Sequence, residues 1–216
     1  MPSQSNAQSY VSARQDFSRH PHWDDLLALD PSVVAEKSGA SYEASDGGGA
    51  FGMDFMGARY RLNLADRTAV SPPGRSELDY NAKIVLLAYL VKSAAGPSPG
   101  LSGREVGPHS LPCGDLFFKG PHELPKAPLA KAFGSDPGAL ARASAAIGAE
   151  TLGALAWKAR VLPKVEVYYY LDPADDEFPA DARYNYDANV CYYLSLDMIF
   201  ALTNFLAQLL ISVKET

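Results

Sequence analysis

The feature that most constrains the fold is an apolar stretch near the C-terminus, residues 190–213. It is long enough to cross a bilayer, because a membrane-spanning helix needs about 20 apolar residues. Three polar side chains interrupt it, Asp197, Asn204 and Gln208. At 100° per residue they fall within about 40° of one another and of Glu215. A mostly buried helix with one narrow polar stripe explains this pattern better than a membrane span, so we expect a core helix and no membrane association.

A second apolar segment, ELDYNAKIVLLAYLVKSAAG, predicts a central helix over about residues 77–94. Its apolar residues cover almost the whole circumference of the helix, which is typical of a helix packed against a sheet and against other elements. Alternating runs predict a hairpin near 50–55 and 58–64, two strands joined at Leu162–Pro163, and one further strand in ARYNYD. We therefore expect an α+β fold with a mainly antiparallel sheet and packed helices.

The chain has 216 residues, which fits one domain of ordinary size. Residues 1–22 are polar and predict a flexible N-terminal segment, and residues 23–216 predict a single α+β domain. The N-terminus has no apolar signal-peptide core. Two cysteines, Cys113 and Cys191, lie far apart in no metal-binding spacing, which is typical of a reducing compartment. We expect a cytoplasmic protein.

The charge pattern argues against nucleic acid as a partner. Nineteen basic and 25 acidic residues give a formal charge of −6, with no dense basic cluster to follow a phosphate backbone. The string GGGAFG at residues 47–52 satisfies the spacing of a dinucleotide-binding turn. A strand-like pattern follows it instead of the required helix, so we interpret it as a loop.

Three longer segments resemble a known family in their order and spacing: MDFMGARYRLNLADRTAV, AKIVLLAYLVKSAAGPSPGLSGREV and LPKVEVYYYLDPADDEFPADARYNYD. The family is the bacterial and archaeal domain of unknown function 3786, and the resemblance covers roughly residues 30–210. Two positions depart from it. Ala88 stands where the family often has histidine, and LSGREV lacks an aromatic residue that is often present. The resemblance implies a role in anaerobic redox or cofactor metabolism and transfers no catalytic residue.

The long Gly- and Pro-rich loop at 96–124 holds the best chemical cluster in the sequence. His109, Cys113 and His122 are residue types that bind zinc or other transition metals. Their spacing matches no strong metal signature, and a fourth ligand would have to come from elsewhere, such as Asp115. A Cys–His nucleophile pair is an alternative. Incidental Cys and His residues are commoner than either.

The stretch YYYLDPADDEFPAD, residues 168–181, combines tyrosines with an acidic loop. A calcium loop would need Gly where Glu177 stands, so a solvated turn is favoured, in which aspartates accept local backbone hydrogen bonds. Glu177 keeps a candidate binding role if Phe178 is a buried anchor beside it. Tyr168 and Tyr170 are candidates for lining a flat ligand or an interface, although packing is the commoner role of strand tyrosines.

Three functional hypotheses follow. The first is a binding or accessory module that holds a small molecule, cofactor or protein partner for anaerobic redox metabolism. The second is an enzyme that uses the His, Cys and carboxylate groups. The third is a structural homodimer with the tyrosine-rich face as its interface. The sequence assigns no particular cofactor and no catalytic residue.

Overall fold

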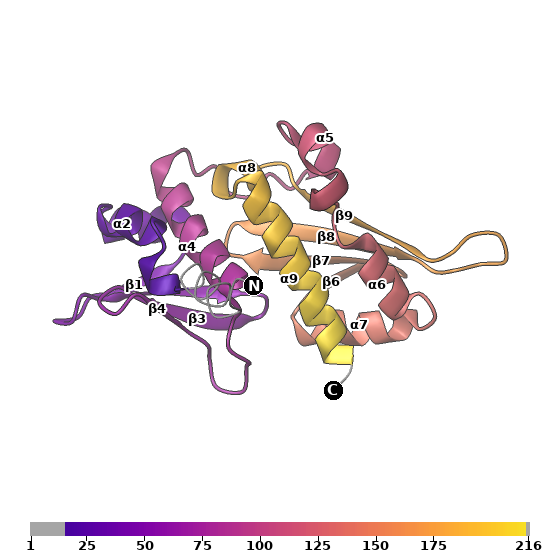
Figure 1. Ribbon diagram of the computed structural model, residues 1–216, viewed down its shortest axis with the longest axis horizontal. Helices are drawn as coiled ribbons and strands as arrows, with labels where there is room; N and C mark the ends of the chain where they lie inside the picture. The colour runs from indigo at the N-terminus through magenta and orange to yellow at the C-terminus, as the bar shows by residue number, and fades with distance from the viewer. Residues whose placement is uncertain (1–15, 215–216) are drawn as a thin grey trace, which may run out of the picture.

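Two antiparallel sheets form the framework of the protein, which we describe from a computed structural model for residues 16–214 (Figure 1). The strands of the first sheet are β1 (Ser41–Glu43), β2 (Ala50–Phe55), β3 (Ala58–Asn63) and β4 (Thr68–Val70). The strands of the second are β5 (Glu105–Val106), β6 (Glu150–Gly153), β7 (Ala156–Leu162), β8 (Val165–Asp172) and β9 (Asp181–Asp187). The first sheet has the order β1-β2-β3-β4, and the second has the order β5-β9-β8-β7-β6. The predicted strands are confirmed, but they form two sheets.

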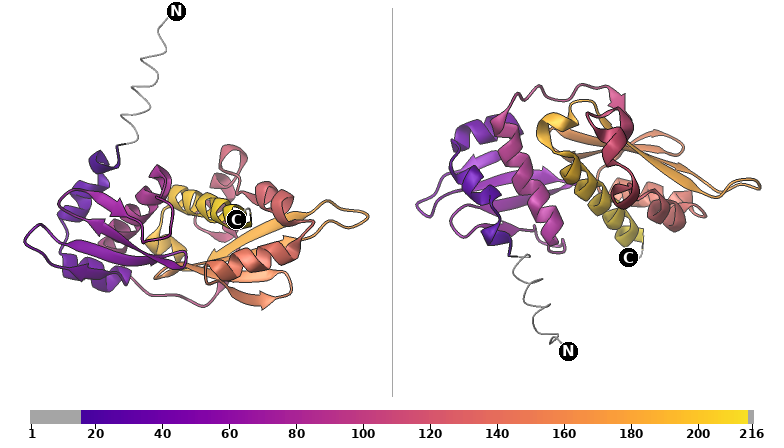
Figure 2. Two further views of the ribbon diagram at one scale, coloured as in Figure 1. Left: turned by 90° about the horizontal axis from the view of Figure 1, so that it is seen from below. Right: turned by 45° about the horizontal axis from the view of Figure 1, so that its top comes forward.

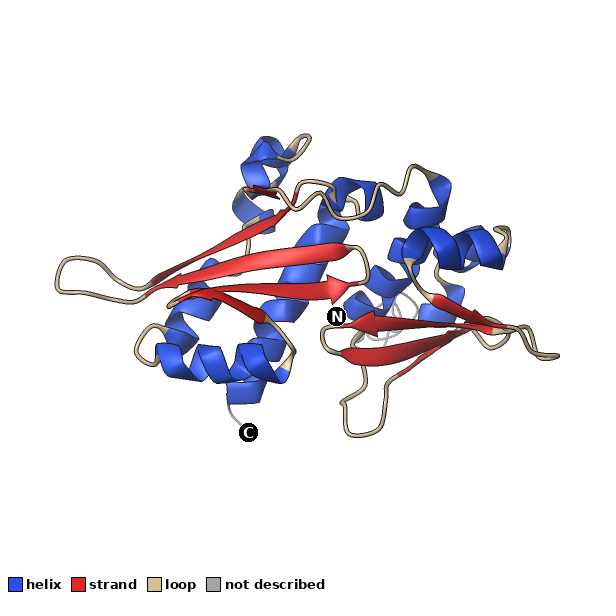
Figure 3. Ribbon diagram, turned by 180° about the vertical axis from the view of Figure 1, so that it is seen from behind, coloured by secondary structure: helices blue, strands red, loops and turns tan. Residues whose placement is uncertain are grey.

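The helices gather on one side of the two sheets, as the view from behind shows (Figure 3). The α-helices are α2 (His22–Leu27), α3 (Pro31–Ser38), α4 (Tyr80–Ala95), α5 (Gly114–Phe117), α6 (Lys126–Phe133), α7 (Pro137–Ala146), α8 (Val190–Tyr193) and α9 (Leu196–Lys214). The short 3-10 turns are η1 (Phe17–Arg19), η2 (Pro108–Ser110) and η3 (Gly120–His122). Figure 2 shows α4 against the first sheet and α9 across one face of the second. The α+β fold predicted from the sequence is confirmed.

Helix α4 confirms the central helix, with a start three residues later than predicted. Asp79 caps it, because its carboxylate accepts a hydrogen bond from the N–H of Ala82 at 2.8 Å. The seven residues 84–90 are all buried. The helix contacts α2 and α3 on one side and α8 and α9 on the other, which explains why its apolar residues surround it.

The predicted long C-terminal helix is confirmed as α9, which the short helix α8 precedes. Leu194 lies between α8 and α9 in extended conformation, with φ −137° and ψ 147°. The hydroxyl of Tyr193 accepts a hydrogen bond from the N–H of Gly100 at 2.7 Å, and the Leu194 side chain is buried. These tertiary contacts hold the chain where periodicity alone would continue the helix. The long helix therefore begins at Leu196, six residues later than predicted.

Helix α9 is less buried than its composition suggests. One face is in the core, and its buried residues are Ile199, Leu202, Thr203, Leu206, Ala207 and Leu210. Asp197 and Gln208 of the predicted polar stripe are exposed, whereas Glu215 lies outside the described residues. By length and composition alone α9 could also cross a membrane. A core helix meets the same criteria, so this finding is weak support for a span.

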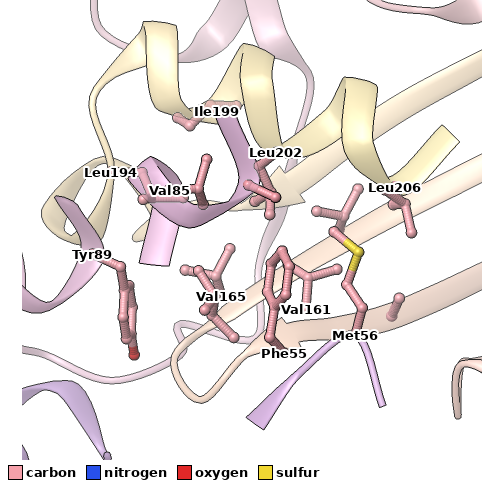
Figure 4. Packing of buried hydrophobic residues seen from close by; sticks show 14 of the residues in the cluster. Phe55, Met56, Val85, Tyr89, Val161, Val165, Leu194, Ile199, Leu202 and Leu206 are labelled. Carbon is pink, nitrogen blue, oxygen red and sulfur yellow. The ribbon is translucent and has the colours of Figure 1, made fainter. Parts of the chain in front are cut away.

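The two sheets share one buried apolar cluster, centred where the β2–β3 turn meets β7 (Figure 4). The N–H of Met56 donates to the carbonyl of Val161 at 3.1 Å, and the Phe55 ring stacks on Phe205 of α9 with centroids 5.4 Å apart. Gly57 completes the turn with φ 76°. Backbone and side-chain contacts therefore join the first sheet, the second sheet and α9.

The predicted flexible N-terminal segment, 1–22, overlaps the folded part of the chain. Phe17 is 9% exposed and packs edge-on against Trp23, with ring centroids 5.2 Å apart. The Trp23 Nε1–H donates to the Phe17 carbonyl at 2.9 Å. Folded structure is thus already present at η1, and residues 1–15 lie outside the described residues.

Candidate functional site

A pocket of about 550 Å³ lies beside β9, between η2 and η3, and we call it the edge pocket. Its walls come from the loop between α4 and α6, from the first residue of α6 and from three consecutive residues of β9. The lining residues are Gly107, Pro108, His109, Phe118, Lys119, Gly120, Glu123, Leu124, Lys126, Arg183, Tyr184 and Asn185. A pocket of this volume can hold a small molecule or a short peptide.

The edge pocket exists because β5 covers only one end of β9. Val106 pairs with Tyr186, and the N–H of Ala188 donates to the Arg104 carbonyl at 2.9 Å. The next position along the same edge would pair residue 108 with Tyr184. Pro108 has no N–H, and the chain turns away there into η2. Within residues 16–214 no strand therefore pairs with this edge of β9 at Tyr184, a residue that is 2% exposed.

The alternation of an antiparallel ladder fixes where the backbone of Tyr184 points. Tyr186 directs its N–H and C=O toward β5, so Tyr184, two residues away, directs its own groups to the same side. On that side, the N–H and C=O of Tyr184 form no backbone hydrogen bond with any residue in the range 16–214. One donor and one acceptor of the main chain thus face the edge pocket.

The polar lining of the edge pocket is cationic. The lining contains one carboxylate, Glu123, and three cations, Lys119, Lys126 and Arg183. With His109 neutral, the formal charge of the lining is +2. The Lys126 ammonium lies 3.4 Å from Glu123. Lys119 forms no ion pair or side-chain hydrogen bond with any other residue that the structure describes. The pocket is therefore a basic site in a chain of net charge −6.

Two neighbours hold Arg183 in place. Its Nε lies 3.3 Å from an Asp172 carboxylate oxygen, and its guanidinium carbon lies 4.9 Å from the centre of the Tyr170 ring. The floor of the pocket is apolar, since Phe118 and Leu124 are 5% and 6% exposed. The site thus combines cationic walls with an apolar base.

The structure separates the three candidate metal ligands His109, Cys113 and His122. His109 is exposed and lines the edge pocket. His122 does not line it, because its ring stacks on Phe117 at 4.4 Å and meets Phe200 of α9 at 5.5 Å. In the described part of the chain, no three His, Cys, Asp or Glu side chains are grouped to hold a metal ion.

Cys113 precedes α5 and has a left-handed backbone conformation, with φ 62° and ψ 8°. Its side chain is exposed, and its carbonyl accepts hydrogen bonds from the N–H groups of Leu116 and Phe117. It is absent from the lining of the edge pocket. His109 and Cys113 therefore do not meet in that pocket as a nucleophile pair.

The acidic loop is a turn organised by Asp175, and the anchor hypothesis for Phe178 is wrong. The Asp175 carboxylate accepts hydrogen bonds from the N–H groups of Glu177 and Phe178 at 2.9 and 2.7 Å, which lowers the pKa of Asp175. The Phe178 side chain is 66% exposed. The predicted turn, in which an aspartate accepts local backbone hydrogen bonds, is confirmed. The binding role of Glu177 was conditional on a buried Phe178, so the structure gives no support for that role.

Tyr168 and Tyr170 lie on the face of the second sheet that the helices leave open. The Tyr170 hydroxyl donates to Glu105 at 2.6 Å, and the Asn185 amide donates to the same carboxylate at 2.6 Å. Burial and the Glu105 hydrogen bond raise the pKa of Tyr170 to about 12. Tyr168 is 7% exposed beside Glu166, with the two oxygen atoms 3.4 Å apart. Neither tyrosine lines the edge pocket, but the Tyr170 ring contacts Arg183, which does.

Sequence reasoning missed most of this pocket. It singled out the loop over residues 96–124 for its His and Cys residues and picked His109, but it passed over Lys119 in that loop and Lys126 just after it. It also passed over Arg183. The available signal was the pair of lysines within and just after that loop, Lys119 and Lys126. Nothing local in the sequence shows that Arg183, about 60 residues away, lies opposite them.

The fold and pocket define a class: an α+β protein of two antiparallel sheets with a basic pocket at a sheet edge. The family model described as domain of unknown function (DUF3786) matches residues 30–209, and the chain belongs to this family. The matched region includes every residue of the edge pocket. No curated protein and no solved structure matches the chain.

Proposed function

We propose that the protein is a binding module that holds an anionic ligand in the edge pocket. The observation that carries the proposal is the convergence of Lys119, Lys126 and Arg183 on an apolar floor beside an unpaired stretch of β9. Carboxylates and phosphates are the natural partners of such cations, because charge-assisted hydrogen bonds are stronger than neutral ones. An accessory role in anaerobic redox metabolism, implied by the family resemblance, is part of this proposal.

The enzyme hypothesis has less support from the same pocket. A catalytic histidine needs a partner that orients its ring and sets its tautomer. His109 makes no side-chain hydrogen bond or ring contact with another residue in the described range 16–214. The homodimer hypothesis stays a prediction. The hydroxyl groups of Tyr168 and Tyr170 contact Glu166 and Glu105 of the same chain.

Calorimetric titration with citrate, and separately with inorganic pyrophosphate, tests the proposal at low ionic strength. We expect saturable binding by the unaltered protein. Lys119→Glu should weaken it at least tenfold, because one contacting charge is replaced by its opposite. Lys131→Glu is the matched control, since Lys131 is an exposed lysine on α6 that does not line the pocket. Absence of binding by both anions, or equal effects of the two variants, would contradict the proposal.

A further inference from the structure

We propose that the ligand of the edge pocket is a short acidic segment of a partner protein, which binds in extended conformation as an added strand beside β9. This inference rests on the proposed function and specifies the occupant of the same pocket. It would extend the second sheet by one strand at the position that β5 leaves open.

The first argument is the hydrogen-bonding capacity of the β9 edge. Tyr184 directs both its N–H and its C=O to the pocket side. An ionised carboxylate group could accept from the N–H, but it has no donor of its own for the C=O. A peptide residue supplies one acceptor and one donor at the spacing that a strand requires. The backbone geometry therefore favours a peptide over a simple anion.

The second argument is the way in which β5 ends. Unpaired strand edges attract additional strands, and proteins usually cover or shorten them. Here β5 covers Tyr186 and Asp187, and Pro108 then diverts the chain into η2. The Tyr184 hydroxyl donates to the Pro125 carbonyl at 3.3 Å, but it lies at the tip of a ring that points off the sheet, so this bond leaves the backbone groups of Tyr184 unpaired. The part of the β9 edge beyond β5 is short, so it suits a short segment.

The third argument is charge. Along β9, Arg183 and Asn185 flank Tyr184 and point to the opposite face from its ring. Lys119 and Lys126 lie on the other wall of the pocket. These cations are spread along the edge, so successive acidic side chains of an extended segment would meet more of them than one small anion can.

Peptides with selectively N-methylated backbones test the inference. The parent probe is fluorescein-labelled TEVEVET with an amidated C-terminus, and binding is measured by fluorescence anisotropy. In an added strand, alternate amides face β9. N-methylation of the amides that face β9 should therefore weaken binding at least tenfold. N-methylation of the alternate amides, which face away from β9, should change the affinity less than twofold. We also expect the parent to bind at least tenfold more tightly than citrate, and TKVKVKT to show no binding.

The possible results separate this inference from the proposed function. If both methylated peptides bind within twofold of the parent, or if the parent binds no more tightly than citrate, strand addition is wrong. In that case citrate binding that is sensitive to Lys119→Glu would leave the anion pocket standing. If neither citrate, pyrophosphate nor peptide binds, both proposals fall. Lys131→Glu again serves as the control, and it should bind the parent peptide like the unaltered protein.

Discussion

Both carboxylate oxygens of Asp187 accept hydrogen bonds from the backbone N–H of Ser102, at 3.0 and 2.9 Å. The same carboxylate accepts from the Ser102 hydroxyl, the Gly103 N–H and the Asn189 N–H, each at 2.9 Å. Asp187 is 1% exposed. These contacts fasten the segment before β5 to the end of β9, so they set where β5 begins and where the edge pocket opens.

Replacing Asp187 by Asn should lower the free energy of unfolding by about 2 kcal/mol, because an amide puts donors where the carboxylate accepted charge-assisted bonds. Urea unfolding measures the change. Asp181→Asn is the control on the same strand, since Asp181 is exposed. It should stay within about 0.5 kcal/mol of the unaltered protein. Equal losses of unfolding free energy in the two variants would show that the Asp187 hydrogen bonds do not stabilise the fold.

The β2–β3 turn should tolerate no side chain at Gly57. Gly57 and Gly74 both have positive φ, 76° and 80°, so alanine is strained by a similar amount at each. A Cβ at Gly57 would lie 2.5 Å from the carbonyl oxygen of Ile147, whereas a Cβ at Gly74 meets nothing within 4 Å. Gly57→Ala should therefore be less stable than Gly74→Ala by about 2 kcal/mol in thermal or urea unfolding. Matching stabilities would contradict the packing of this turn.

A hydroxyl pair fastens α9 to the second sheet. The Thr203 hydroxyl donates to the Ile199 carbonyl at 2.7 Å, so the Tyr186 hydroxyl, 2.8 Å away, must donate to Thr203. Tyr186→Phe should lower the free energy of unfolding by about 1 kcal/mol, because one buried hydrogen bond is lost. Tyr192→Phe is the matched control, since Tyr192 is 46% exposed. A Tyr186→Phe variant as stable as this control would argue against the pair.

Alkaline pH should unfold the protein through its buried tyrosines. Burial raises the pKa values of Tyr89, Tyr169, Tyr184 and Tyr186 above the ordinary value of 10. Above pH 10 the unfolded chain releases these protons before the folded chain does. The unfolded state then binds fewer protons, so stability falls as pH rises and is unaffected below pH 10.

Absorbance near 295 nm measures this directly. Part of the tyrosine signal should appear only when circular dichroism shows loss of structure, whereas the exposed phenols titrate normally. Full ionisation of all tyrosines near pH 10 in a protein that is still folded would contradict the burial of the four side chains.

The sequence was sufficient for elements that depend on local patterns. Asp30 caps α3, Pro31 follows it and Gly39 ends the helix, and Asp136 caps α7 before Pro137; these are local start and stop signals that the sequence itself displays. The Asp175 turn is also local, because its hydrogen bonds reach only two and three residues ahead. Such features need no knowledge of the rest of the fold.

Features that depend on distant partners could not be predicted. At the junction of α8 and α9 the Tyr193 hydroxyl is bonded to Gly100, which is distant in the sequence. Phe178 is exposed because the β8–β9 loop extends beyond the helices (Figure 1). The edge pocket forms only when β5 pairs with β9, which brings Lys119 and Arg183 into one site. Periodicity predicts strands, but it does not predict which edge stays open.

The most direct test of the anion pocket is to locate bound citrate by amide chemical-shift mapping on isotope-labelled protein. The account predicts that shift changes cluster at residues 107–109, 118–126 and 183–185, that they saturate, and that they are lost in Lys119→Glu. The first sheet, residues 41–70, should show no change and serves as the internal control. Changes that cluster on any other surface, or no saturable change at all, would contradict the edge pocket as the binding site.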